Sequence, residues 1–420
     1  MKNRRRKSWV LAALALTALA AKADALPLGL PGPNLPNLPA GSVIGRAGDA
    51  VDSTLATVRR DLAGRPVVSS ARFDRDPNGA RVVRHEVLAV APTDQSLAIA
   101  QAQGFEVLRT DTLGALGLTV VVLRAPSDST DALKTLRAAD PSGTYEYDHI
   151  YDPSGDIANA SAAQTHAAPA LKSGTVGIVD GGIDRKHSVF ADANIVTFNA
   201  VSKTDVPSAH GTAVASLLVG NRGAAPDAKL YAADVFGGEP NGGSAAAIVR
   251  GLAWLAQNEV PVINVSLSGP QNAVVGAAVK ALVARGFVIV AAVGNDGPAV
   301  PVTYPAAYDG VVAVTSVDNA HRIQIDANRG PAVMFAAFGV GVRAAKPGGG
   351  YATLTGTSFA APIVAANLAS LIARPNVAAA AAARKRLEDL ALDLGAPGRD
   401  PVYGYGFLAA PGSETQTAVR

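Results

Sequence analysis

Short apolar runs alternate with longer apolar or amphipathic stretches from about residue 152 to near the end of the chain. The expected strands are Thr175–Val179, Lys229–Val235, Val262–Leu267, Phe287–Val293 and Val311–Val317. The expected helices are Gly211–Leu218, Ser244–Gln257, Ala273–Arg285, Ser358–Ile372 and Val377–Leu394. Strands that are apolar throughout and separated by helices predict a parallel sheet covered on both faces. In such sheets, ligand sites form beyond the carboxyl ends of the strands.

A different pattern precedes this region, between residues 86 and 151. Strands are expected at Glu86–Ala91, Phe105–Leu113, Leu118–Arg124 and Thr144–Ile150, and helices at Thr93–Gly104 and Asp128–Ala139. Each expected helix begins with a suitable capping residue. The order βαββαβ predicts a small α+β domain of the ferredoxin-like type. That fold alone indicates no function.

The first residues have the pattern of a secretory signal. Basic residues between Lys2 and Lys7 precede an apolar stretch from Trp9 to Ala20, and small residues follow it. This pattern predicts a signal peptide over residues 1–23, too short for a membrane span. Because three arginines are consecutive, a twin-arginine signal is the alternative. Residues 24–80 are expected to form a Pro- and Gly-rich linker with one short helix, and residues 411–420 a polar tail.

Composition changes this picture in two respects. Residues 1–23 contain six basic and no acidic residues, so their removal takes the formal charge from +3 to −3. No basic cluster remains, so we expect no nucleic-acid partner, and no later apolar stretch is long enough to serve as a membrane anchor. The chain has no cysteine, which excludes disulfides, a thiol nucleophile and thiolate metal sites.

Four polar residues occupy the positions where such a sheet would hold a site. Asp180 directly follows an apolar strand, His210 stands at the start of a helix, and Asn295 follows another strand through a glycine. Ser358 lies in the sequence GTSFAAP at the start of an Ala-rich helix, where unpaired backbone N–H groups can face a developing negative oxygen. Each residue alone has an ordinary alternative, such as a turn aspartate or a surface histidine. Coincidence is a poor explanation for all four in this order.

The region from about residue 173 to 408 resembles the catalytic domain of subtilisin-like serine proteases. The matching sequences are VDGGID around Asp180, HGT and VAS from His210 onward, AAP leading to KLY, VINVSLS, GN ending at Asn295, and GTSFAAP around Ser358. The resemblance implies Ser358 as the nucleophile, His210 as general base and then general acid, and Asp180 as the residue that orients His210. It also implies that the Asn295 side chain joins the Ser358 N–H group in an oxyanion hole.

The same resemblance implies a domain organisation. A three-layer α/β domain with a mainly parallel central sheet would span residues 152–410. A ferredoxin-like propeptide over residues 81–151 would inhibit it until the chain is cut near Tyr151. The edge formed by Ser266, Leu267, Ser268 and Gly269 would pair with extended substrate backbone. No carboxylate cluster indicates a metal site, although relatives often bind structural calcium through loop carbonyls that a sequence does not reveal. No other cofactor is expected.

These observations predict an exported serine endopeptidase, extracellular or periplasmic and monomeric, that is made as an inhibited zymogen and acts on polypeptides. A non-catalytic peptide-binding relative is the alternative, disfavoured because all four polar positions are filled. A lipase or esterase is disfavoured because the Gly-x-Ser-x-Gly sequence is absent. A metalloprotease is disfavoured because the chain has no His-Glu-x-x-His sequence.

Overall fold

The computed structural model describes residues 72–157, 174–202, 204–239 and 242–411. The expected signal peptide, most of the expected linker and nearly all of the expected tail lie outside the described residues. The described end of the linker contains a short strand, β1 (Phe73–Arg75), which pairs with β2 (Arg81–Val90). No helix in the described part of the chain is long and apolar enough to cross a membrane.

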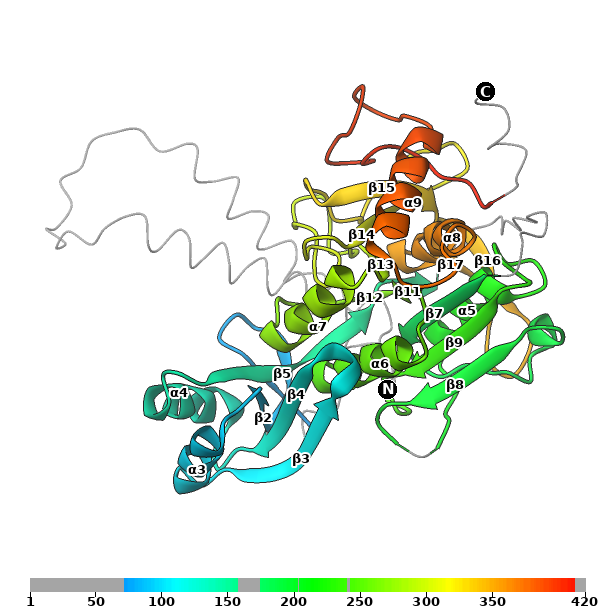
Figure 1. Ribbon diagram of the computed structural model, residues 1–420. Coiled ribbons are helices and arrows are strands. Elements are labelled where there is room, and N and C mark those ends of the chain that lie inside the picture. The colour runs from blue at the N-terminus through cyan, green and yellow to red at the C-terminus, as the bar shows by residue number, and fades with distance from the viewer. Residues whose placement is uncertain (1–71, 158–173, 203, 240–241, 412–420) are drawn as a thin grey trace, which may run out of the picture. The chain divides into compact units, whose positions relative to one another are not determined.

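A seven-stranded parallel sheet forms the centre of the larger region, in the order β15-β14-β13-β11-β7-β9-β8 (Figure 1). Its strands are β7 (Thr175–Asp180), β8 (Ile195–Asn199), β9 (Lys229–Asp234), β11 (Val262–Val265), β13 (Val288–Ala292), β14 (Val312–Val317) and β15 (Val333–Phe338). The sequence predicted the five inner strands and missed both edge strands. β8 is only half-buried, and β15 contains two residues with weak strand propensity, Ala336 and Ala337.

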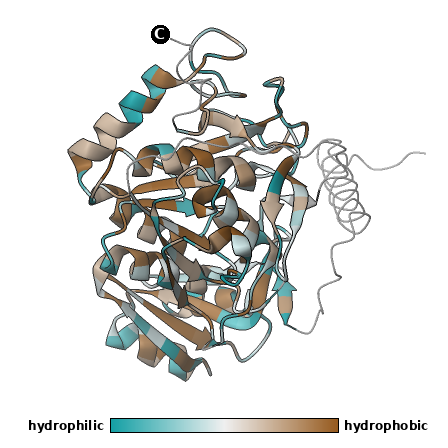
Figure 2. Cartoon of the chain, turned by 90° about the vertical axis from the view of Figure 1, so that its right-hand side faces the viewer, coloured by the Kyte–Doolittle hydropathy of each residue, from teal (hydrophilic) through white to brown (hydrophobic). Residues whose placement is uncertain are grey.

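Helices cover both faces of this sheet, as the sequence pattern predicted. They are α5 (Ala209–Val219), α6 (Ala245–Gln257), α7 (Ala273–Ala284), α8 (Thr357–Ala369) and α9 (Val377–Leu390), and a 3-10 turn, η2, spans Ser188–Phe190. One core joins α5, α8 and α9 to one face of the sheet, and a second core joins α6 and α7 to the other face. Figure 2 shows the matching hydropathy, with mostly hydrophobic residues on the central strands and helices. The fold is therefore three-layered.

The smaller region has the predicted βαββαβ order. After β2 come α3 (Asp94–Ala102), β3 (Glu106–Leu113), the 3-10 turn η1 (Gly114–Leu116), β4 (Leu118–Arg124), α4 (Ser129–Ala139) and β5 (Thr144–Pro153). The strands form an antiparallel sheet in the order β5-β2-β4-β3. Val121 and Leu123 of β4 pack with α3 and α4, whereas Val120 and Val122 pack with the α6 and α7 core. Burial on both faces explains the apolar run from Val120 to Leu123 in β4.

The strand β5 continues beyond its predicted end. Its last residues leave the small sheet and pair antiparallel with β10 (Gly243–Ser244) on one side and β12 (Leu267–Ser268) on the other. The chain then forms β6 (Asp156–Ile157), which extends a hairpin made of β16 (Val342–Ala345) and β17 (Tyr351–Thr355). The segment that joins the two regions is therefore extended and backbone-paired on both sides of Ser154.

Candidate active site

Asp180 and His210 form a buried hydrogen-bonded pair. Asp180 ends β7 and has no exposed surface, and His210 is the second residue of α5, whose N-cap is Ser208. The His210 Nδ1 atom lies 2.9 Å and 3.0 Å from the two Asp180 carboxylate oxygens. Gly211 permits this approach, because a Cβ atom there would lie 2.1 Å from the carbonyl oxygen of Gly181.

The Asp180 carboxylate fixes the tautomer of the His210 ring. A carboxylate only accepts hydrogen bonds, so Nδ1 carries the proton and the Nε2 atom of the neutral ring keeps its lone pair. Nε2 is buried and has no hydrogen-bond partner among the described residues. The arrangement leaves His210 able to accept a proton at Nε2.

Ser358 is the second residue of α8 and is fully buried. The ring of Phe359, the next residue, has its centroid 5.6 Å from that of His210, so the start of α8 is a neighbour of the imidazole. The Ser358 hydroxyl donates to the carbonyl oxygen of Ser266 at 2.9 Å, and no hydrogen bond between the described residues joins it to His210. The hydroxyl must leave Ser266 before it can bond Nε2.

Two backbone N–H groups at the start of α8, those of Ser358 and Thr357, donate hydrogen bonds. The backbone N–H of Ser358 donates to the carbonyl oxygen of Ser154 at 3.0 Å. The Asn295 side chain accepts from the N–H of Thr357 through Oδ1 at 3.1 Å. Because a backbone N–H can only donate, the Asn295 atom in this contact must be oxygen, and Nδ2 is directed away from Thr357.

The edge from Ser266 to Gly269 holds the end of β5. The Ser266 carbonyl oxygen accepts from the N–H of Ser154 at 3.3 Å, and Leu267 and Ser268 pair with Pro153 and Asp152. The Tyr151 ring packs on Gly269, where a Cβ atom would lie 2.7 Å from Cδ1 of that ring. The structure thus brings Ser358 and the edge from Ser266 to Gly269 to the segment that joins the two regions. Asn295 lies beside Thr357 at the start of α8, and the Asp180–His210 pair neighbours the same helix through Phe359.

Small residues also allow the joining segment to fit tightly. A Cβ atom at Gly242 would lie 2.0 Å from the carbonyl oxygen of Tyr151, and one at Gly356 would lie 2.4 Å from the Cα atom of Gly155. A Cβ atom at Gly155 itself would lie 2.5 Å from Cε2 of Phe359. Sequence reasoning missed the Gly243 edge, although the pair Gly242–Gly243 before a helix was a signal that could have found it.

The βαββαβ region also contacts the N-termini of α6 and α7. The Asp148 carboxylate accepts from the N–H of Ala246 at 2.9 Å, and the Glu146 carboxylate accepts from the N–H of Ala273 at 3.2 Å. Burial raises the pKa of Asp148 to about 7, and the charge of nearby Glu86 contributes in the same direction. Negative groups at helix N-termini are electrostatically favourable, which opposes part of that burial penalty.

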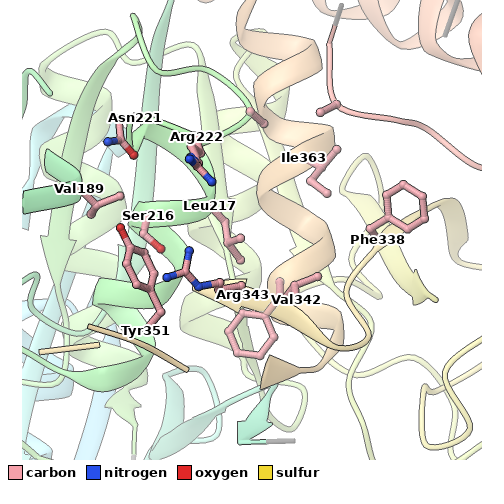
Figure 3. Close-up of a pocket in the computed structure, with 13 residues that line it drawn as sticks. Val189, Ser216, Leu217, Asn221, Arg222, Phe338, Val342, Arg343, Tyr351 and Ile363 are labelled. Atoms are coloured by element: carbon pink, nitrogen blue, oxygen red, sulfur yellow. The ribbon is translucent and has the colours of Figure 1, made fainter. Parts of the chain in front are cut away.

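A cavity of about 50 Å³ lies beside the start of α8. Figure 3 shows Ser216 and Leu217 on one side of it, Ile363 on the opposite side, and Val342 and Arg343 from the hairpin below. Phe359 also lines this cavity, but none of the eight predicted site residues does. In the part of the chain that the structure describes, no group of His, Asp or Glu side chains could hold a metal ion.

The site thus contains a hydrogen-bonded Asp–His pair and a serine at a helix start whose N–H holds a carbonyl of an extended segment. These features define the class of serine peptidases. Comparison with known proteins identifies the family. The model of the subtilase family matches residues 172–406, which is more than half of the chain. The chain belongs to the subtilase family and is a subtilisin-like serine peptidase.

Individual relatives agree with this assignment. The chain is 36% identical over 246 residues to subtilisin DY of Bacillus licheniformis, which covers 56% of this chain and 88% of that protein. It is 31% identical over 253 residues to the minor extracellular protease Epr of Bacillus subtilis (strain 168), covering 58% of this chain but only 39% of that protein. The crystal structure of fervidolysin from Fervidobacterium pennivorans has a TM-score of 0.67 at 20% identity, over 82% of this chain and 63% of that one, and shows the same fold.

Proposed function

We propose that this chain is an exported serine endopeptidase made as a propeptide-inhibited zymogen. In this proposal Ser358 is the nucleophile, His210 the general base and acid, Asp180 its orienting partner, and Asn295 an oxyanion donor. One observation carries the proposal. The carbonyl oxygen of Ser154 accepts from the Ser358 N–H at 3.0 Å, within an extended segment, as a bound peptide substrate would.

The same contact supports a particular bond as the one to be cut. A carbonyl that sits on the Ser358 N–H is the one whose carbon the Ser358 hydroxyl would attack, so the bond between Ser154 and Gly155 is our proposed cleavage site. It lies three residues beyond Tyr151, where the sequence resemblance alone suggested the cut. The difference arises because the register depends on pairing with Gly243 and Leu267, which are remote in sequence.

The proposed reaction follows from the hydrogen bonds at the site. The Ser358 hydroxyl rotates from Ser266 to His210, passes its proton to Nε2 and attacks the Ser154 carbonyl carbon. The resulting oxyanion is held by the Ser358 N–H and by Nδ2 of Asn295. His210 then returns the proton to the nitrogen of Gly155, which leaves, and an ester between Ser154 and Ser358 remains. Water activated by His210 hydrolyses that ester.

The contacts that would keep the cut fragment bound lie before the scissile bond, so they do not depend on that bond being intact. Residues up to Ser154 remain paired with β10 and β12, and Tyr151 is fully buried with its hydroxyl donating to the Pro270 carbonyl at 2.8 Å. Contacts of Asp148 and Glu146 with the starts of α6 and α7 add a second attachment. The fragment that ends at Ser154 would therefore stay bound as a competitive inhibitor.

Export is supported by the basic and apolar pattern of residues 1–23 and by the extracellular relative named above. The polypeptide substrates of the mature enzyme would be bound as residues 151–154 are, by strand pairing between two edges. Backbone pairing of this kind accepts many sequences.

The test compares the wild-type chain with Ser358→Ala. We expect the wild type to release a fragment ending at Ser154, to leave a new N-terminus at Gly155 and to digest an unfolded protein such as casein. The Ser358→Ala chain should stay uncut and inactive while its circular dichroism spectrum matches that of the wild type. Equal processing of both chains would refute self-cleavage, and a folded, cut wild type that digests nothing would support the peptide-binding alternative.

A further inference from the structure

The proposed oxyanion donor Asn295 depends on a second amide that the mechanism does not otherwise use. Gln324 lies on the loop after β14 and is 8% exposed. Its Nε2 atom donates to Oδ1 of Asn295 at 3.1 Å. We infer that Gln324 is a positioning residue that holds the Asn295 amide with Nδ2 facing the oxyanion. This inference rests on the proposed role of Asn295.

The orientation of both amides is set by neighbouring donors. The Thr357 N–H requires oxygen at the nearer Asn295 position, so Gln324 must present nitrogen to the same oxygen. The other end of the Gln324 amide then presents Oε1, which accepts from the Ser316 hydroxyl. A hydroxyl can donate there, so the chain of contacts is consistent from Ser316 to Asn295.

Gln324 is held in place along its backbone as well. Its N–H donates to the carbonyl oxygen of Ser316, on β14, at 2.9 Å. The side chain therefore reaches Asn295 from a point anchored to the central sheet. Asn295 itself follows β13 through Gly294, whose φ of 103° is a conformation that side chains rarely adopt. The two hydrogen bonds to Oδ1, from Gln324 and from the Thr357 N–H, set which way the Asn295 amide is turned.

Through Asn295, Gln324 would stabilise the transition state of the reaction and would not contribute to substrate binding. Nδ2 of Asn295 has no hydrogen bond among the described residues, whereas Oδ1 has two donors. If Gln324 is lost, only Thr357 holds the amide, and the fraction of molecules with Nδ2 in position falls. Because the oxyanion forms only during reaction, this loss should lower kcat and leave KM nearly unchanged.

Two substitutions test the inference, with kcat and KM measured on a chromogenic peptide and with the self-cleavage rate of the full chain. Gln324→Met keeps the length but removes the donor, and should lower kcat by about 2- to 12-fold, the effect of one neutral hydrogen bond. Gln324→Glu at pH 8 places an acceptor against Oδ1 and should approach the loss of about 10²–10³ expected for a missing oxyanion donor. The activity of this second variant relative to the wild type should recover as the pH falls towards 5, because the introduced carboxyl can donate again once it is protonated.

A double-substitution cycle separates positioning from a general structural effect. In an Asn295→Ala background, Gln324→Met should have no further effect on kcat. A matched control is Asn367→Leu, which removes a buried amide that donates to the carbonyls of Ile363 and Ala409 and should lower Tm without this coupling. The inference is overturned if Gln324→Met leaves kcat unchanged, or lowers it by the same factor with and without Asn295. If the wild type itself is inactive, the proposed function fails instead.

Discussion

Replacing Gly155 with alanine tests the proposed cleavage site through a single methyl group. A Cβ atom at this position would lie 2.5 Å from Cε2 and 2.7 Å from Cζ of Phe359. Carbon atoms in contact prefer about 3.5–4.0 Å, so the ring or the peptide must shift by about 1 Å. The backbone itself adds no strain, because Gly155 is not among the glycines with positive φ.

The size of the effect follows from the packing around Phe359. The ring is 2% exposed and is held between the joining segment and the core of α5 and α8. Inserting a methyl group into a well-packed site costs about 1–3 kcal/mol. If the methyl group displaces the Ser154–Gly155 bond from Ser358, this cost adds to the activation free energy, and self-cleavage should slow by about 5- to 150-fold. The small cavity next to Phe359 favours the lower end, because the ring can move towards it.

The assay is a time course of the full-length chain, separated by gel electrophoresis, with the cut located by mass spectrometry. Gly114→Ala is the matched control, since Gly114 has ordinary φ and a Cβ atom there would meet nothing within 4 Å. In a Phe359→Leu background, where the clashing ring is gone, Gly155→Ala should slow self-cleavage less than it does in the wild type. The assignment of the cut is refuted if Gly155→Ala matures at the wild-type rate, or if the new N-terminus is not residue 155.

Two further predictions concern the fragment that ends at Ser154, followed by gel filtration of the cut chain. Tyr151→Phe removes the hydrogen bond to Pro270 and should speed release of the fragment by about 2- to 12-fold, and release at the wild-type rate would argue against that bond. Tyr151→Ala also empties a fully buried site and should make the free energy of fragment binding less favourable by about 3–5 kcal/mol. Burial raises the pKa of Asp148 to about 7 in the bound state, above its ordinary value of about 4 in a released fragment, so the bound state takes up a proton between these values. The contribution of Asp148 to retention should therefore be fully present below about pH 4 and be lost as the pH rises through 7, with a fall of about 10- to 100-fold between pH 5 and pH 8. Asp148→Asn should flatten this profile, and a profile that Asp148→Asn leaves unchanged would contradict the assignment.

Local patterns of apolar residues predicted most of the strands and helices of the fold. Apolar strands such as Val288–Ala292 must be buried on both faces, and only a parallel sheet between helix layers does this for many strands at once. The GTSFAAP stretch predicted the helix start at Ser358, and α8 begins at Thr357. The ends of helices were predicted less well, because the last turn of a helix depends on the residues that pack against it in the folded protein. The prediction that the last helix reaches Leu394 was wrong: α9 ends at Leu390, and Leu392 instead pairs with Phe407.

The sequence by itself determined which residues could carry the chemistry. Asp180, His210, Asn295 and Ser358 stand at strand ends and helix starts, and those positions follow from patterns within about ten residues of each. Only the tertiary structure decided how the joining segment lies between β10 and β12, and hence that Ser154 rather than Tyr151 presents its carbonyl to Ser358. It also decided that Gln324 reaches Asn295. Strand register and a hydrogen bond between two loops depend on partners far away in the chain, so no local pattern encodes them.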